Sequence, residues 1–157
     1  MKVQKTVTSI IDVDLAFEDI SLLSVEEADL IPQSIRAIEC GSWLRSPSKI
    51  SGFAAYVHGS GYVDEFGFDI GSSGGVRPAL LVPNLKSSNL QIGDKIEVVG
   101  FPFTVVSESI LLCDIVPFRS EFGKTNDYET SIVKESLYKW AKDVGIDFEG
   151  VSKEHEL

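Results

Sequence analysis

The segment FAAYVHGSGYVDEFGFDI (Phe53–Ile70) decides the fold, because it joins two strand signals to a turn signal. Aromatic and β-branched residues dominate Phe53–His58 and Tyr62–Ile70, a composition typical of short β-strands. Between them stands HGSG (His58–Gly61), whose glycines are typical of a hairpin turn. We therefore expect two strands paired as a hairpin within a mainly antiparallel framework.

Strand signals of similar length recur on both sides of this hairpin. Residues 2–15 form a β-branched run that predicts one or two strands, and Gly75–Val82 predicts another in which Pro78 indicates an edge or bulge position. Three further segments, with turns at Gly100 and at Glu108-Ser109, are spaced closely enough for an antiparallel meander. These segments are Ile92–Val99, Phe103–Ser107 and Ile110–Val116.

Two helices complete the prediction. Ser24 and Glu27 fit a capping box at the start of a short helix that runs to about Leu30 and stops at Pro32. Apolar residues recur at helical spacing over residues 132–144, with Ser131 as N-cap and Gly145 just after the end, so we expect an amphipathic helix that packs on the sheet. Short strands with two helices indicate the α+β class rather than alternating βαβ units.

The chain length of 157 residues suits one domain, residues 1–157, which needs no disulfide or metal to stabilise it. The net charge of −10 is spread evenly along the chain and argues against direct nucleic-acid binding, which requires clustered Lys and Arg. The acidity serves either solubility or attraction of a basic partner. Residues 146–157 are expected to form a flexible tail.

The cysteines, Cys40 and Cys113, are not placed at metal-ligand spacing, so we expect buried free thiols, no metal and no cofactor. The start, MKVQKTVTSI, lacks the apolar run of a signal peptide, and no stretch is long and apolar enough for a membrane helix. We therefore expect a cytoplasmic protein. The final EHEL resembles a retention signal only loosely, and such a signal needs secretion first.

Two motifs, GSWLRSP (Gly41–Pro47) and GVRPAL (Gly75–Leu80), together resemble an uncharacterised bacterial and phage domain family. In that family a Gly-rich segment with an A-x-V-x-x-x-G-x-V core separates the motifs, and AYVHGSGYV (Ala55–Val63) matches it. ISLLSVEEA (Ile20–Ala28) also resembles a family segment. The resemblance covers most of the chain, and its signature residues are expected to be structural. They are Trp43, Arg45, Pro47, Arg77 and Pro78.

The order of the parts differs from that of most relatives. The segment that begins at IGDKIEVVG (Ile92–Gly100) looks like the part that opens the domain in relatives, yet here it comes last. The resemblance therefore implies a circular permutation. Its signature-bearing half is 2–82, its joint is Pro83–Asn89 (83–89), and its strand meander and helix are 90–145. It also implies a fold similar to the C-type-lectin-like and formylglycine-generating-enzyme-like folds, and a phage or prophage origin.

Arg45 and Arg77 have two interpretations. Paired guanidinium groups grip a carboxylate or phosphate, which would make a small anionic ligand or an enzymatic role conceivable. Alternatively, each arginine braces Gly-rich loops by bonding backbone carbonyls or a buried acid such as Asp69. Trp43 has a similar choice between stacking on a ligand and filling core volume. We favour the structural interpretation for all three residues.

Catalysis is not expected. His58 lacks companions for a metal site or general base, His155 lies in the tail, and no G-x-S-x-G motif marks a nucleophile. Cys40 and Cys113 do not form the paired-cysteine motif of the formylglycine-generating enzymes, and the calcium-lectin motifs Glu-Pro-Asn and Trp-Asn-Asp are absent. Asp12 and Asp14, on one side of a strand, are expected to face solvent.

The hairpin is the best candidate contact surface, because aromatic side chains interleaved with glycine and polar residues are typical of recognition loops. The alternative is that alternate members of this set face the core. We predict a non-catalytic phage or prophage protein that binds a host or viral protein. One alternative is an acidic inhibitor of a host nucleic-acid enzyme that mimics DNA charge. The other is a binder of a small anionic ligand, or an enzyme that acts on one. The predicted contact residues are Tyr56, His58, Tyr62, Asp64 and Phe66, followed along the strand by Phe68.

Overall fold

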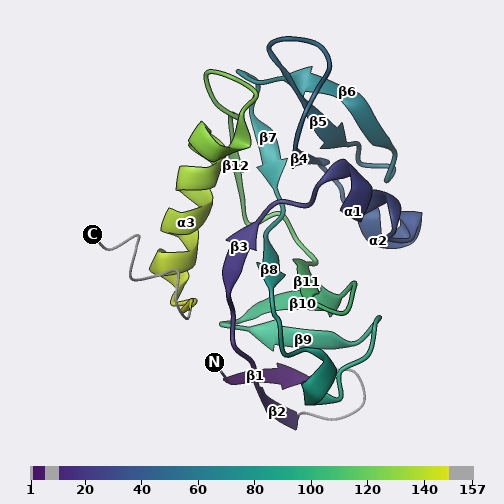
Figure 1. The fold of residues 1–157 in the computed structure, drawn as a ribbon, viewed down its shortest axis with the longest axis vertical. Coiled ribbons are helices and arrows are strands. Elements are labelled where there is room, and N and C mark those ends of the chain that lie inside the picture. The colour runs from purple at the N-terminus through teal and green to yellow at the C-terminus, as the bar shows by residue number, and fades with distance from the viewer. Residues whose placement is uncertain (1, 6–10, 149–157) are drawn as a thin grey trace. The chain divides into compact units, whose positions relative to one another are not determined.

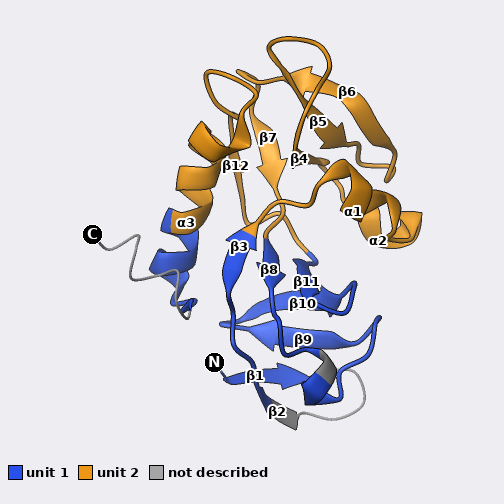
Figure 2. Cartoon of the chain, in the orientation of Figure 1, with its two compact units in different colours: residues 1–20, 79–114, 139–157 blue, residues 21–78, 115–138 orange. Residues whose placement is uncertain are grey.

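The computed structural model describes residues 2–5 and 11–148, which form short strands and helices (Figure 1). Every strand pair with a defined register is antiparallel, so the predicted α+β class with mostly antiparallel strands is confirmed. The chain divides into two compact units, residues 1–20, 79–114 and 139–157, and residues 21–78 and 115–138 (Figure 2). Each unit includes sequence from both sides of the Pro83–Asn89 segment. That the two units fold as one domain stays a prediction.

The first unit is built on a seven-stranded sheet in the order β2-β1-β9-β10-β11-β8-β3. Its core includes Val3, Phe17, Ile96, Phe103 and Leu111, all buried. The predicted meander is confirmed as β9, β10 and β11, with slightly different bounds. The strands are β1 (Lys2–Lys5), β2 (Ile11–Asp14), β3 (Asp19–Ser21), β8 (Ala79–Leu81), β9 (Lys95–Val98), β10 (Phe101–Val105) and β11 (Ile110–Cys113).

The turn between β9 and β10 contains an unusual residue. Val98 pairs with Phe101, which leaves Val99 and Gly100 as a two-residue turn, and both have positive φ, 45° and 87°. Hairpin turns of this kind favour Asn-Gly, because a β-branched side chain is strained in the left-handed region. The predicted turn at Gly100 is confirmed, and Val99 is a strained position within it.

The Pro83–Asn89 segment, the joint that the resemblance implies, has regular structure of its own. It contains the 3-10 helix η1 (Lys86–Ser88), and Leu85 is fully buried. The Asn84 side chain accepts a hydrogen bond from the backbone N–H of Ala16 at 3.3 Å. The segment is therefore packed into the first unit, because Leu85 is buried and Asn84 bonds the backbone there.

Helix α3 (Ile132–Val144) forms as the sequence predicts. The Ser131 hydroxyl accepts from the backbone N–H of Lys134, and Gly145 has a φ of 94° just after the helix. The N–H groups of Gly145 and Ile146 donate to the carbonyls of Lys142 and Ala141, which is the Schellman ending. The Trp140 ring meets Phe101 of β10 edge-on at 5.2 Å, so the end of the helix packs on the sheet as expected.

The flexible tail expected over residues 146–157 does not begin at residue 146. Ile146 and Phe148 are buried, so packed structure continues beyond Gly145. The rest of the predicted tail, including His155 and the terminal EHEL, lies outside the described residues. The side chain of Asp12 is also outside the description, whereas Asp14 is exposed as expected.

The second unit contains a three-stranded sheet in the order β4-β5-β6 and a separate β12-β7 pair. The predicted hairpin is confirmed as β5 and β6, and the predicted capping box is present, since Ser24 and Glu27 bond each other's backbone N–H groups. The elements are α1 (Val25–Asp29), α2 (Gln33–Arg36), β4 (Ser42–Pro47), β5 (Phe53–Val57), β6 (Val63–Asp69), β7 (Gly74–Val76), β12 (Phe118–Ser120) and η2 (Tyr128–Thr130).

One sequence prediction about these elements is wrong, and some elements were not predicted. Pro32 ends α1 as expected, but a further helix, α2, begins directly after it because the Pro32 carbonyl accepts from Ile35 and Arg36. The single strand expected over Gly75–Val82 is two strands, β7 and β8, in different sheets, since the backbone leaves the ladder at Pro78, which has no N–H. Strands β4 and β12 were not predicted.

Candidate functional site

Trp43 on β4 has a structural role. Its side chain is almost fully buried, and the indole Nε1 donates a 2.8 Å hydrogen bond to the Ser120 carbonyl of β12. The backbone of Gly74 lies so close that a Cβ there would stand 2.4 Å from Nε1. A buried indole with its donor satisfied has no face available for stacking on a ligand, in agreement with the interpretation of Trp43 as core.

Arg45 braces the segment before α1. Its Nη1 donates to the Leu22 carbonyl at 2.8 Å and to the Glu27 carboxylate. Burial on its own would raise the pKa of Glu27, but the hydrogen bonds from Arg45 and Ser24 outweigh it and lower that pKa. The guanidinium group therefore holds the same carboxylate that caps α1.

Arg77 braces α2 instead. It is buried between β7 and β8, and its Nη1 donates to the carbonyls of Ile35, at 2.7 Å, and Arg36, at 3.3 Å. The suggested partner Asp69 is exposed, and its carboxylate accepts from the backbone N–H of Gly71. Arg45 thus bonds the Leu22 carbonyl and the Glu27 carboxylate, whereas Arg77 bonds carbonyls of α2, and no shared anion site follows from these bonds.

The two signature prolines occupy different environments. Pro47 ends β4, is exposed and pairs in register with Ala54, whereas Pro78 is buried in the break between β7 and β8. Both positions limit strand pairing because proline offers no N–H to the ladder.

Tyr56 of β5 is a core residue of the hairpin. It is only 3% exposed, packs edge-on against Trp43 and stacks on Phe68 at 4.5 Å. Its hydroxyl donates to the Cys40 carbonyl, and burial raises the pKa of this phenol. The prediction that Tyr56 is a contact residue is therefore wrong, because its place on β5 faces the core.

His58 and Asp64 are in hydrogen-bond contact across the hairpin. His58 Nε2 lies 2.8 Å from Asp64 Oδ2, and the imidazole also stacks on the Tyr62 ring at 5.8 Å. Burial alone would raise the pKa of Asp64, but the hydrogen bonds from His58 and from two backbone N–H groups outweigh it and lower that pKa. The structure thus brings together three of the predicted contact residues, His58, Tyr62 and Asp64.

The other oxygen of Asp64 organises a β-bulge in β6. Oδ1 accepts from the N–H groups of Phe66 and Gly67, both at 3.0 Å, at the point where the register between β5 and β6 shifts. Gly67 has a φ of 72°, and a Cβ there would lie 1.7 Å from the Ala54 carbonyl oxygen. Only glycine fits, and the bulge presents Phe66 next to it.

Three rings at this hairpin remain open to solvent. Tyr62 is 60% exposed, Phe66 59% and Phe68 40%, whereas the rings of Trp43 and Phe122 are buried. We call Tyr62, Phe66 and Phe68 the aromatic surface. The Phe68 ring stacks on the buried Tyr56 ring, and the Tyr62 ring stacks on His58. Each of these two exposed rings therefore packs against an ordered neighbour.

Helix α2 and Arg36, which the sequence analysis did not single out, position the hairpin turn. Arg36 Nε donates to the Gly61 carbonyl at 2.8 Å, and Nη1 donates to the carbonyl of Ile31 at 2.7 Å. A Cβ on Gly61 would lie 2.7 Å from the Gln33 carbonyl. Nothing in the sequence distinguishes Arg36 from other arginines, because its partners are distant backbone carbonyls.

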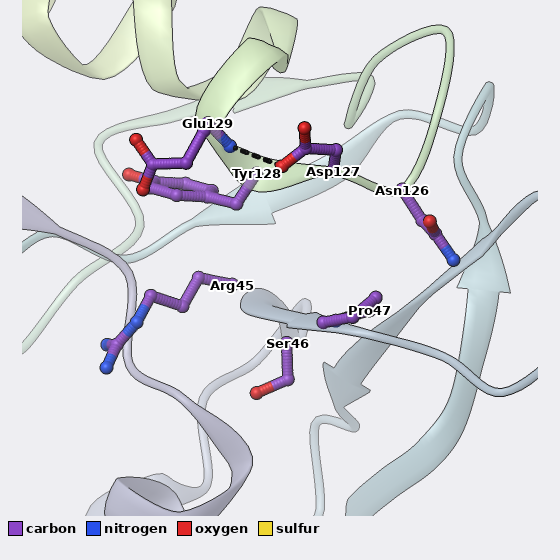
Figure 3. Close-up of a pocket in the computed structure, with 7 residues that line it drawn as sticks. All are labelled: Arg45, Ser46, Pro47, Asn126, Asp127, Tyr128 and Glu129. Carbon is purple, nitrogen blue, oxygen red and sulfur yellow. Dashed lines mark hydrogen bonds between the residues drawn. The ribbon is translucent and has the colours of Figure 1, made fainter.

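A pocket of about 510 Å³ lies elsewhere in the second unit (Figure 3). Figure 3 shows Arg45–Pro47 of β4 on one side and Asn126–Glu129 on the other. Two of its polar residues serve the fold: the Asn126 amide donates to two backbone carbonyls, and Asp127 accepts from the N–H of Glu129. No local sequence pattern indicates this pocket, since it joins segments about eighty residues apart.

Comparisons give no family for the chain: no family model, curated protein or solved structure matches it. Within the part of the chain that the structure describes, no group of three or more His, Cys, Asp or Glu could hold a metal ion. Cys40 is exposed, contrary to the prediction of two buried thiols, and Cys113 is buried. Among the described helices, none is long and apolar enough to span a membrane.

Proposed function

We propose that the protein is a non-catalytic, phage- or prophage-encoded binding protein of the host cytoplasm. Its target is a host or viral protein, and its contact surface is the aromatic surface of β6 and the preceding turn. The single observation that carries the proposal is the exposure of Tyr62, Phe66 and Phe68 on a hairpin whose Tyr56 ring is buried. Exposed aromatic rings gathered in one place are a common sign of a protein interface.

The energetics support a specific interface. Three rings of this size that are about half exposed would bury on the order of 300 Å² on binding, worth roughly 7 kcal/mol at ~25 cal/mol/Å². Association costs about 4 kcal/mol or more in lost translational and rotational entropy. The rings therefore supply the core of the interface, and neighbouring contacts must supply the rest of the binding free energy. Because Asp64, His58 and Gly67 order the hairpin before binding, little further entropy is lost there.

The phage origin and the finer fold assignment belong to this proposal. We infer a C-type-lectin-like architecture that is circularly permuted at Pro83–Asn89. Support comes from the two sequence motifs and from the compact units, each of which combines residues from before and after this segment. Segments that are interleaved in this way allow the chain to be reopened at a surface position with little change in packing.

Capture from a host lysate tests the proposal. The full chain is used as bait beside the double variant Tyr62→Ser/Phe66→Ser and the control Ile92→Ser, which alters an exposed apolar residue of the other unit. We expect one stoichiometric protein partner that is lost with the double variant and kept with the control. A partner retained by the double variant, or a bound metabolite with no protein, contradicts the proposal.

A second candidate, an acidic inhibitor that mimics DNA charge, is favoured by the three acids of β6 and the net charge of −10. The two candidates differ in their salt response. Binding by charge mimicry weakens steeply as ionic strength rises, whereas binding dominated by the aromatic surface changes little. Measuring the affinity of the captured partner at low and at molar salt separates them.

A further inference from the structure

The strand that holds Phe66 and Phe68 also carries two exposed acids, which neighbour these rings in sequence. Strand β6 reads VDEFGFD (Val63–Asp69), so Glu65 precedes Phe66 and Asp69 follows Phe68. Both carboxylates are exposed, and the strand contains neither lysine nor arginine. A partner that covers the rings must therefore also meet negative charge, which is costly unless it brings cations.

Several basic side chains of this unit bond to other groups, and among them Arg119 donates to the Ser73 carbonyl. His58 is directed to Asp64, and the Arg36 guanidinium donates to the carbonyls of Gly61, Ile31 and Ala28. The ion pairs of the described residues include neither Glu65 nor Asp69. Their charge is thus available to a partner.

The backbone of β6 is a poor place to add a strand. Although β6 lies at the edge of the β4-β5-β6 sheet, the N–H groups of Phe66 and Gly67 already donate to Asp64. A bulge on an edge strand breaks the regular row of donors and acceptors that strand addition requires. Recognition at this surface must therefore use side chains.

Resting on the proposed function, we infer that the aromatic surface binds an arginine-containing segment of the partner protein. A planar guanidinium stacks on an aromatic face and at the same time pairs with a carboxylate through two N–H groups. The rings of Tyr62, Phe66 and Phe68 supply the faces, and Glu65 and Asp69 supply the carboxylates. Lysine offers a compact, strongly hydrated charge that satisfies these two requirements together less well.

The test uses two fluorescein-labelled peptides of equal length and charge, one of Arg-Gly repeats and one of Lys-Gly repeats. Fluorescence anisotropy with the full chain at low salt reports both affinities. We expect the arginine peptide to bind about fivefold tighter, as a cation–π advantage of about 1 kcal/mol gives. Equal affinity of the two peptides, or no binding of the arginine peptide, overturns the inference.

Variants locate the binding. Phe66→Ser and the charge variant Glu65→Gln/Asp69→Asn should each weaken the arginine peptide about fivefold. The matched control Glu135→Gln/Asp147→Asn removes the same charge from exposed positions elsewhere and should change the affinity less than twofold. If the control weakens binding as much as the charge variant does, the effect is general electrostatics and the inference is wrong.

The outcome for the proposed function is separate. Loss of the lysate partner with Tyr62→Ser/Phe66→Ser, together with no preference for the arginine peptide, would leave the protein-binding proposal standing and reject the arginine-containing segment. Retention of the partner by that double variant would reject the proposed function itself. All of these variants replace exposed side chains, and circular dichroism checks that each one folds.

Discussion

Replacing Gly67 by alanine tests the bulge that presents Phe66. The Cβ would lie 1.7 Å from the Ala54 carbonyl oxygen and 2.5 Å from its carbon, both backbone atoms that cannot rotate away. The residue also has a φ of 72°, which costs a non-glycine residue roughly 1–2 kcal/mol. Forcing β5 and β6 apart adds about 1–3 kcal/mol, so the total loss of stability should be about 2–5 kcal/mol.

Gly52→Ala is the matched control, because it separates the steric clash from the backbone strain. Gly52 lies in the same unit and has a φ of 81°, but a Cβ there meets nothing within 4 Å. It should therefore lose only the roughly 1–2 kcal/mol of the left-handed conformation. The difference between the two variants isolates the contact with Ala54.

Urea unfolding and thermal melts, both followed by circular dichroism, measure the two variants. For a chain of this size each kcal/mol lowers Tm by about 2–4 °C, so Gly67→Ala should melt clearly below Gly52→Ala. If the two variants lose the same stability, β6 does not approach Ala54 as the structure has it. The reasoning about the bulge, and with it the ordered presentation of Phe66, would then fail.

Three further predictions concern single positions. Val99→Asn should raise stability by about 1 kcal/mol in urea unfolding, because asparagine tolerates the positive φ of this turn, while Val99→Ile, still β-branched, should give no gain. Trp43→Phe should cost about 1–3 kcal/mol, since the Ser120 carbonyl loses its buried donor, whereas the half-buried Trp140→Phe should cost less. The lowered pKa of Asp64 stabilises the fold at pH values above the ordinary carboxyl range near pH 4, and this contribution is lost as the pH falls through the lowered pKa. Asp64→Asn should therefore be less stable at pH 7, and its free energy of unfolding should fall less steeply with decreasing pH. An unchanged pH dependence would contradict the contact with His58.

Local signals predicted the elements they control. The capping box of Ser24 and Glu27, the Ser131 N-cap and the Gly145 ending all depend on hydrogen bonds within a few residues, and all form where the sequence places them. The hairpin and the meander also follow from turn residues between short apolar runs. These parts of the α+β fold needed no knowledge of distant contacts.

Long-range pairing escaped the same reasoning. The break at Pro78 was foreseen as an irregularity, but its separation of β7 from β8 into two sheets depends on the remote partners β12 and β11. Likewise, Tyr56 and Phe68 stack on each other, yet one is buried and the other exposed. Alternation along a strand does not say which face the rest of the chain will cover.

The sequence by itself determined the class of structure, the chain reversals and the segment that holds the candidate surface, because these arise from backbone preferences and neighbouring side chains. Only the tertiary structure decided which residues form that surface. The bulge at Gly67 exists because the Ala54 backbone approaches from β5 and Asp64 takes the freed N–H groups. Exposure is a property of what packs against a side chain, so Phe66 became accessible and Tyr56 became core through contacts that no local pattern contains.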